Sequence, residues 1–514
     1  MAVPSSTSTG ESHKKSGGSD TAVGSLGERA VSGVSWLMLQ TIAARIMTLT
    51  TNVVISRWLL KREDFATAAM AFSLCTVFAL FQPGNLSDIL VQRHRQFQRW
   101  ANSAFWLSVT AGLSILAIAG ILAPIGRHIF NSPMIPWLIL IQGTSMAIGG
   151  LNAVWSAEQS LRFNFRLVAA ISTFVSLVAS ASTIFLAWLG CGPLSLALPS
   201  LLSSTLTIII LGSRSEFRPH FGISLARWRG LIRDAVLLSV AGFFSLVTMQ
   251  ADNFFLGLYR KNELGNYVWA YALSLQFVQL ASGSLRGALL PAFTSINTDR
   301  QRSEAALRRA VSLVSLVTMP MCVLIVPAMP AVVRLVFSAK WDGAVPFVQI
   351  FLPSMGFVIV STIFVTTMQS RGFYKRYVAA CALLAFLFVA SVWPSAAFGG
   401  PIAVAYVVSV IYAGGCFVIL GISTYQTPLR DQLSLAIASI FPFVLAAISA
   451  TFAWWVQVQV CSDPHDWKAG ALAIGIGAPT FSVLALVLLK RDVKLLFDRA
   501  LPVMIRSSKF LRRK

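Results

Sequence analysis

The feature that most constrains the fold of this chain is a series of long apolar runs separated by short polar loops. A helix that crosses the hydrocarbon core of a bilayer needs about 20 mostly apolar residues, because the core is about 30 Å thick. Helices satisfy their backbone hydrogen bonds internally, and these runs are too long for barrel strands. The sequence therefore predicts an all-α polytopic membrane protein with about 14 transmembrane helices. They lie near residues 31–57, 64–82, 102–123, 134–156, 167–190, 193–212, 235–257, 266–284, 310–333, 344–367, 377–397, 401–422, 433–456 and 469–489.

The placement of Lys and Arg predicts how these helices are oriented. The net charge of +22 could suggest a nucleic-acid partner, but the basic residues gather in alternate loops. If the N-terminus is cytoplasmic, the cytoplasmic loops and both tails hold 31 of the 41 Lys and Arg, and the opposite loops hold 9. This asymmetry is the positive-inside rule. It predicts cytoplasmic termini, basic loops that attract anionic membrane lipids, and no nucleic-acid partner.

A reporter fusion tests this topology. A reporter that is active only in the cytoplasm should be active when it is fused after residue 514, because an even number of spans returns the chain to the side on which it began. Activity there of a reporter that works only outside the cytoplasm would contradict the predicted topology.

The spans and loops suggest six segments. Residues 1–28 are rich in Ser, Gly and Thr and lack the apolar core of a signal peptide, so we expect a disordered cytoplasmic tail. The next expected segments are an N-lobe with helices 1–6 (29–212), a cytoplasmic linker (213–232), a C-lobe with helices 7–12 (233–424) and helices 13 and 14 (425–489). The last segment is a basic cytoplasmic tail (490–514), which is either an amphipathic helix on the inner leaflet or a solvated segment.

An internal repeat supports the two lobes. A shift of 201 residues places Asn52 on Asn253, Ala69 on Ala270 and Ser73 on Ser274. A shift of 207 places the Arg127-x-x-Phe130 motif on Arg334-x-x-Phe337, and both motifs fall at outer helix ends. Halves with an even number of helices share one orientation, and the substrate site usually lies between them. We therefore expect two pseudo-symmetric six-helix lobes plus two extra C-terminal helices.

One polar stripe runs along the first helix. Arg45 lies near the middle of the apolar run, and Thr41, Thr48, Asn52 and Ser56 share its face. A charge at this depth is costly and normally faces a cavity or a partner. We interpret this stripe as the wall of a substrate cavity in which Arg45 faces an anion. A structural network of hydrogen bonds between helices is the alternative.

Helix seven carries a second stripe, formed by Ser245, Thr248 and Asp252. The repeat puts it in the place equivalent to the first stripe, so Ser245 and Thr248 are further cavity candidates. Asp252 is the candidate for ion coupling, because a buried carboxylate can exchange a proton near neutral pH. A role in helix packing, or contact with water at the outer helix end, remains open for Asp252.

Other features of the sequence limit the ligands and activities that the chain could have. Arg286 and Arg371 lie at inner helix ends, where they either form an inward mouth for an anionic headgroup or snorkel to the interface. The six cysteines are scattered without a CxxC pair, so neither a disulfide framework nor a metal site is expected. No cofactor is expected. No GxxxxGK[ST] phosphate loop is present, so this chain does not hydrolyse ATP. The short outer loops argue against a polymerase or ligase.

Five stretches of the chain resemble one family. They are SRWLLKREDFATAAMA, GNLSDILVQR followed by AFWL, QADNFFLGLYRKNELGNYVWAY, LLPAFTSINTDRQRSEAALRRAVSL and VRLVFSAKWDGAVPFVQI. They are similar to Wzx-type polysaccharide flippases, the polysaccharide-transporter branch of the multidrug/oligosaccharidyl-lipid/polysaccharide exporter superfamily. The likeness runs from about residue 29 to residue 425. Asn262-Glu263 departs from the small residues usual in the family.

The resemblance implies a secondary transporter, not an enzyme, with two lobes around a central cavity. The expected substrate is an undecaprenyl-diphosphate-linked oligosaccharide, flipped across the bacterial inner membrane by ion-coupled alternating access, as in an antiporter. Exopolysaccharide is the favoured product, with lipopolysaccharide O-antigen and capsule open, and a polymerase and export machinery are expected partners. Arg45 suits a diphosphate, because guanidinium groups bind phosphate bidentately. A multidrug exporter of the same superfamily and a membrane polymerase or ligase are the alternatives.

Overall fold

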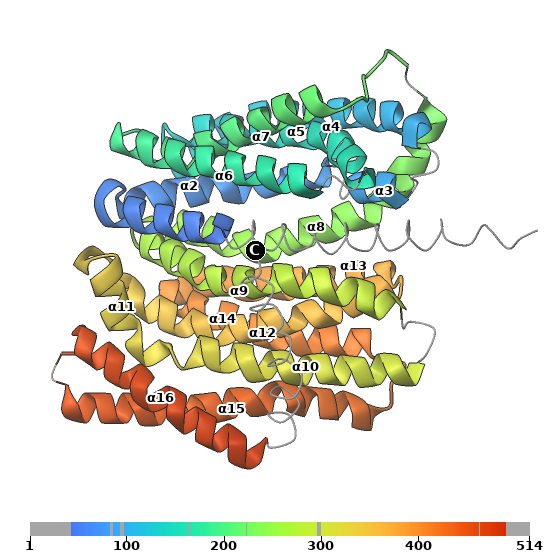
Figure 1. Cartoon of the computed structure of the whole chain (residues 1–514). Helices are drawn as coiled ribbons and strands as arrows, with labels where there is room; N and C mark the ends of the chain where they lie inside the picture. The colour runs from blue at the N-terminus through green and yellow to red at the C-terminus, as the bar shows by residue number, and fades with distance from the viewer. Residues whose placement is uncertain are drawn as a thin grey trace, which may run out of the picture.

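The computed structural model describes residues 43–82, 86–92, 97–162, 165–222, 224–295, 300–461 and 463–489. Helices dominate this part of the chain, and it contains no strand. The two predicted tails and Thr41 lie outside the described residues. The prediction of an all-α membrane protein is confirmed (Figure 1).

The first group of helices lies together in the upper part of Figure 1. We call residues 43–59 and α2–α7 the N-lobe. Residues 43–54 are helical and continue into a π-helical turn, Ile55–Leu59. The following helices are α2 (Arg62–Cys75), a 3-10 turn (Thr76–Leu80), α3 (Leu86–Gln92), α4 (Phe97–Phe130), α5 (Ile135–Leu161), α6 (Phe165–Trp188) and α7 (Leu194–Arg214).

The second group lies below the first in the same view, and we call α8–α14 the C-lobe. Its elements are α8 (Leu225–Tyr259), α9 (Lys261–Ser295), α10 (Arg300–Val323), α11 (Met329–Val336), α12 (Val345–Ser370), α13 (Tyr374–Pro394) and α14 (Gly400–Ser423). Short 3-10 turns, Val326–Ala328 and Ala339–Ala344, flank α11. The chain ends its described part with α15 (Leu429–Val460) and α16 (Trp467–Leu488).

Eleven described segments are long and apolar enough to cross a membrane. One of them, Tyr374–Ser423, contains two helices, α13 and α14, which meet at Gly400 with a φ of 79°. Residues 43–59 and α9 run beside the others (Figure 1). Counting these helices separately accounts for all fourteen expected spans.

Packing joins the two lobes over part of their length. One apolar cluster contains N-lobe residues such as Met70 and Phe130 together with Leu256, Trp269 and Trp341 of the C-lobe. Phe130 ends α4, and Leu256 and Trp269 lie near the end of α8 and the start of α9, which is the predicted outer end of these helices. The lobes are therefore in direct contact there.

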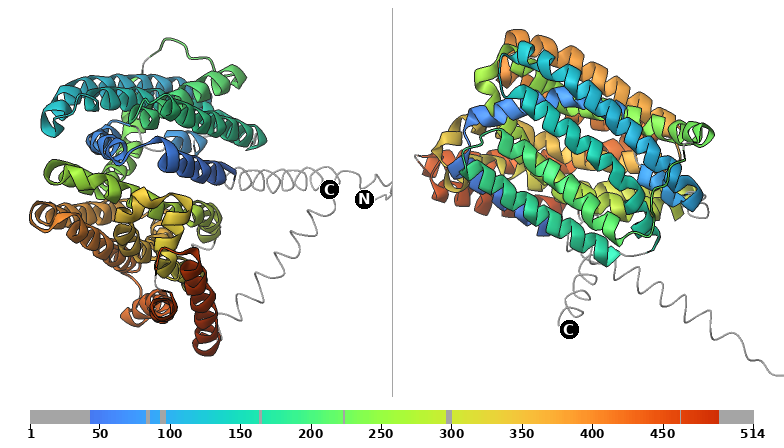
Figure 2. Two further views of the ribbon diagram at one scale, coloured as in Figure 1. Left: turned by 90° about the vertical axis from the view of Figure 1, so that its left-hand side faces the viewer. Right: turned by 90° about the horizontal axis from the view of Figure 1, so that it is seen from above.

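The two extra helices cover the far side of the C-lobe. Leu445 of α15 and Phe481 of α16 pack with Leu316 and Val323 of α10 in a separate apolar cluster. In the left view of Figure 2, α15 and α16 (red) lie at the opposite side of the bundle from the N-lobe helices. This arrangement confirms them as an addition to the two six-helix lobes.

Candidate functional site

Arg45 joins the two lobes through a contact with α9. Its guanidinium donates a hydrogen bond to Oε1 of Gln279 on α9, a residue 234 positions away. Both side chains are partly buried. No carboxylate is within ion-pair distance of Arg45 among the described residues. The positive charge is therefore hydrogen-bonded but not neutralised by a described residue.

The first stripe contacts α9 at a second point, further along the helix. Thr48 donates to the carbonyl of Ala44 in its own helix, at 2.9 Å. Further along, the Oγ atom of Ser56 accepts a hydrogen bond from the indole of Trp269 on α9, also at 2.9 Å. The stripe thus borders α9 at both of its described ends, which means that it lies on the boundary between the lobes.

The second stripe faces the interior of its own lobe. Ser245 lies 3.6 Å from the Sγ atom of Cys381 on α13. The carbonyl of Thr248 accepts a hydrogen bond from Tyr412 on α14, at 3.3 Å. Ser245 thus faces α13 of its own lobe, whereas the hydroxyl of Thr248 donates to the carbonyl of Phe244 within α8. The roles of all these residues in substrate binding stay predictions.

Asp252 is fully buried in the C-lobe. Its Oδ2 atom accepts a hydrogen bond from the hydroxyl of Tyr267 on α9, at 2.6 Å, and its Oδ1 atom accepts one from the backbone of Asn253, at 2.9 Å. Within the described part of the chain no Lys, Arg or His pairs with this carboxylate. An ionised carboxylate buried without a counter-charge is costly. A proton or a bound cation would remove that cost.

Two more tyrosines lie beside this carboxylate. The hydroxyls of Tyr271 on α9 and Tyr412 on α14 are hydrogen-bonded to each other at 2.5 Å. Phe351 packs edge-on against both Tyr267 and Tyr271. Hydroxyl groups and one carboxylate are therefore gathered inside an apolar shell made by α8, α9, α12 and α14. Asp252 was predicted from the sequence, whereas these tyrosines were not, although Tyr267 and Tyr271 lie in one of the five family-like stretches.

The predicted inner mouth is only partly described. Arg371 follows α12 and donates a hydrogen bond to Ser303 of α10, at 3.2 Å. Arg286 belongs to α9, but its side chain lies outside the described part of the structure. A shared role of these two residues in binding a headgroup stays a prediction.

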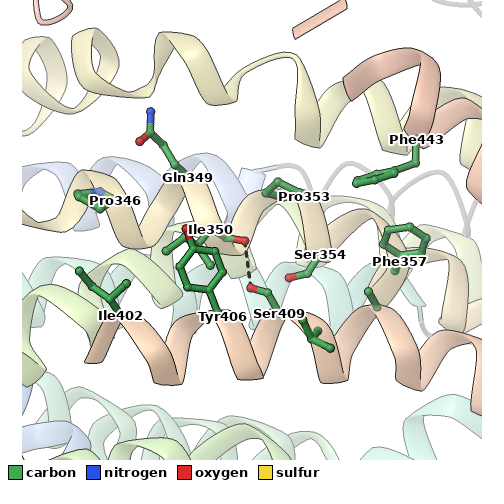
Figure 3. Close-up of a pocket in the computed structure, with 12 residues that line it drawn as sticks. Pro346, Gln349, Ile350, Pro353, Ser354, Phe357, Ile402, Tyr406, Ser409 and Phe443 are labelled. Carbon is green, nitrogen blue, oxygen red and sulfur yellow. Dashed lines mark hydrogen bonds between the residues drawn. The ribbon is translucent and has the colours of Figure 1, made fainter. Parts of the chain in front are cut away.

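A groove of about 570 Å³ lies on the C-lobe between α12, α14 and α15 (Figure 3). Its lining includes Ile350, Pro353, Phe357 and Phe443, and Ser409 uses its hydroxyl to bond the carbonyl of Ile350 at 3.0 Å. No charged residue lines this groove. It therefore lacks the groups that would hold an anionic headgroup.

A buried glutamate, for which the sequence predicted no functional role, binds the segment that connects the two lobes. The carboxylate of Glu158, at the end of α5, accepts hydrogen bonds from the Ser215 hydroxyl and from the backbone of Glu216 (3.1 Å) and Phe217 (3.3 Å). Arg162 pairs with both glutamates, at 2.9 Å to Glu158 and 2.5 Å to Glu216. Its hydrogen bond lowers the pKa of Glu216 from its ordinary value. The start of the linker is thereby attached to the N-lobe.

The described chain is a two-lobed bundle of membrane-spanning helices with a cation, Arg45, on the boundary between the lobes. The family described as "Polysaccharide biosynthesis protein" matches residues 54–346, which is more than half of the chain. The chain belongs to this family, and the resemblance noted in the sequence is confirmed. Its functional class is transmembrane transport in polysaccharide biosynthesis.

Two curated relatives are similar over about two thirds of the chain. The "Succinoglycan biosynthesis transport protein ExoT" of Rhizobium meliloti (strain 1021) is 24% identical over 350 residues, covering 66% of this chain and 69% of the relative. The "Lipopolysaccharide biosynthesis protein WzxC" of Escherichia coli (strain K12) is 20% identical over 329 residues, covering 63% and 67%. The names of both relatives place them in polysaccharide biosynthesis.

Solved structures share the fold. The lipid II flippase MurJ in an inward closed conformation aligns with a TM-score of 0.69 at 15% identity, covering 89% of this chain and 99% of that structure. A multidrug resistance transporter of the MATE family in an inward-facing conformation aligns with a TM-score of 0.57, also at 15% identity, covering 80% and 98%. At this identity the likeness establishes the two-lobed bundle and not a substrate.

Proposed function

We propose that this protein flips an undecaprenyl-diphosphate-linked oligosaccharide from the inner to the outer face of a bacterial inner membrane. The observation that carries the proposal is Arg45, a cation on the lobe boundary bonded to the neutral Gln279. A guanidinium with no described carboxylate partner suits a diphosphate, because it can bind two phosphate oxygens at once. Thr48 and Asn52 on the same helix would contribute polar groups for the sugar.

The transport mechanism we propose is alternating access coupled to an ion gradient. A charged, sugar-bearing headgroup cannot cross hydrocarbon without a polar path. Since the sequence contains no ATP site, the energy comes from an ion gradient or from removal of the product outside. Asp252 is the proposed ion site, because its carboxylate is buried with hydroxyl groups and without a described cation.

The finer assignments follow from the same proposal. Both termini are cytoplasmic, and Arg286 and Arg371 form the inward mouth. The product is an exopolysaccharide, with O-antigen and capsule as the other possibilities, and a polymerase and export machinery act after the flip. The match to the polysaccharide family favours this function over multidrug export. The positive charge of Arg45 also disfavours multidrug export, because it would repel cationic substrates. The short described turns at the predicted outer end disfavour a polymerase or ligase.

Deleting the chain from its host distinguishes the three functions. We expect surface polymer to disappear while complete lipid-linked repeat units accumulate on the cytoplasmic leaflet, out of reach of an impermeant sugar oxidant in spheroplasts. Units that accumulate within reach of the oxidant would identify a polymerase or ligase. Normal polymer with lost resistance to toxic cations would identify a multidrug exporter.

A further inference from the structure

The repeated Arg-x-x-Phe motif marks two equivalent helix ends, one in each lobe. α4 ends at Phe130 and is followed by Asn131 with a φ of 48°, and α11 is followed by Phe337 and then Ser338 with a φ of 95°. A residue with a positive φ just beyond the last turn is a common way to end a helix. The last carbonyls of such a helix lack partners inside it and carry the negative end of the helix dipole. Each lobe therefore presents a carbonyl-rich helix end of this kind at the predicted outer end.

Each of these helix ends receives a cation from the other lobe. Arg57 of the N-lobe donates to the carbonyls of Leu335 and Val336 at the end of α11, at 2.6 and 2.9 Å. Lys261 of the C-lobe donates to the carbonyl of Phe130 at the end of α4, at 3.1 Å. The contacts are reciprocal, as expected for two related halves.

A third cation extends this set. Lys340 donates to the carbonyl of Leu60 at 2.9 Å, and its own carbonyl accepts a hydrogen bond from Arg62. Beside it, the indole of Trp341 donates to the carbonyl of Ser56 at 2.9 Å and stacks on Trp269, with ring centroids 4.4 Å apart. All of these bonds cross between the lobes at the same end of the bundle.

We propose that Arg57, Lys261 and Lys340 form a reciprocal clasp that holds the lobes together at the predicted outer end. The clasp uses neutral carbonyl acceptors, and no carboxylate pairs with these three cations among the described residues. Parting the lobes therefore exposes cations and carbonyls to water without leaving a buried carboxylate unpaired. Such contacts can form and break during a transport cycle. The role of the clasp in transport rests on the proposed function, but its role in closure does not.

The backbone approach at the clasp is close. A β-carbon at Gly265 of α9 would lie 2.3 Å from the carbonyl oxygen of Arg62, which is too near for any real contact. Glycine at this position therefore permits the closed arrangement, and an added methyl group should act as a wedge between the lobes. Gly120 of α4 offers a control, because nothing lies within 4 Å of its added β-carbon.

Distances between spin labels on the purified full chain test the clasp. Met134 and Leu335 are exposed at the predicted outer end of the two lobes and can be changed to labelled cysteines, with Cys191, Cys381 and Cys461 replaced by serine. The unaltered clasp should give one short distance. Combined Arg57→Gln, Lys261→Gln and Lys340→Gln changes should raise the ratio of longer to short distances at least about tenfold, because three charged hydrogen bonds are lost.

Two controls make the result specific. Arg127→Gln, Arg260→Gln and Lys468→Gln remove the same charge from exposed residues at this end and should leave the short distance unchanged. Gly265→Ala should produce the longer distance with all three cations present, whereas Gly120→Ala should not. A single short distance in the clasp variants, or an equal shift in the charge control, would overturn the proposal. Because no substrate is added, either result is independent of what the protein transports.

Discussion

Arg45→Ala should lower polymer export at least about 30-fold while the protein still inserts in the membrane. The change removes the guanidinium from the charge pair that we propose with the diphosphate, and truncating one partner of a desolvated, hydrogen-bonded charge pair costs about 2–5 kcal/mol. The side chain is partly buried on the lobe boundary and is joined to the C-lobe through Gln279. If the diphosphate replaces this neutral partner, the loss of the guanidinium removes the interaction that distinguishes an anionic headgroup from water. The measurement is surface polymer in a deletion strain that carries each variant at equal membrane abundance.

Two further variants separate charge from packing. Arg45→Lys keeps the charge but loses bidentate geometry, so we expect partial export. Gln279→Leu removes the hydrogen-bond partner and leaves the guanidinium in place. Export close to normal in Gln279→Leu, combined with loss in Arg45→Ala, would support binding of the substrate by Arg45. Full export by a well-expressed Arg45→Ala protein, or equal losses in both variants, would instead leave Arg45 as a structural contact between the lobes.

The sequence predicted the fold in more detail than the site, for a physical reason. A transmembrane helix can be recognised from its own residues, because each apolar run of about 20 residues is by itself long enough to cross the hydrocarbon core. The two lobes could also be predicted, because the internal repeat aligns positions such as Arg127 and Arg334. Contacts between helices leave no such pattern in the sequence. The partner of Arg45 lies 234 residues away, and nothing in the sequence around Gln279 distinguishes it from other polar residues of α9.

The second stripe illustrates the same limit. Helical spacing correctly groups Ser245, Thr248 and Asp252 on one face of α8, but it does not determine which neighbour that face meets. Ser245 contacts Cys381 on α13 and Asp252 accepts a hydrogen bond from Tyr267 on α9, so these two side chains face neighbours in the C-lobe. Sequence equivalence between repeats therefore predicted the position of the stripe within its lobe better than its surroundings.

Asp252→Asn should abolish the response of transport to an ion gradient while leaving headgroup binding intact. The amide resembles a protonated carboxyl in shape and charge, so it can keep the contact with Tyr267 but cannot release or accept a proton at neutral pH. A ligand shifts an equilibrium between two conformations only through its different affinities for them. A permanently neutral side chain removes the difference on which coupling depends.

Vesicles that contain the purified protein and a lipid-linked oligosaccharide provide the measurement, with a pH or sodium gradient imposed across the membrane. Tyr267→Phe is the matched control, because it removes the 2.6 Å hydrogen bond but keeps the titratable carboxylate. We expect it to retain a gradient response, whereas Asp252→Asn should flip the substrate at the same rate with or without the gradient. Tyr267 and Trp269 belong to the same turn of α9, so the label pair Met134–Leu335 also reports whether neutralising Asp252 shifts the clasp. An equal gradient response in wild type and Asp252→Asn would exclude Asp252 from coupling and assign its buried hydrogen bonds to the packing of α8 against α9.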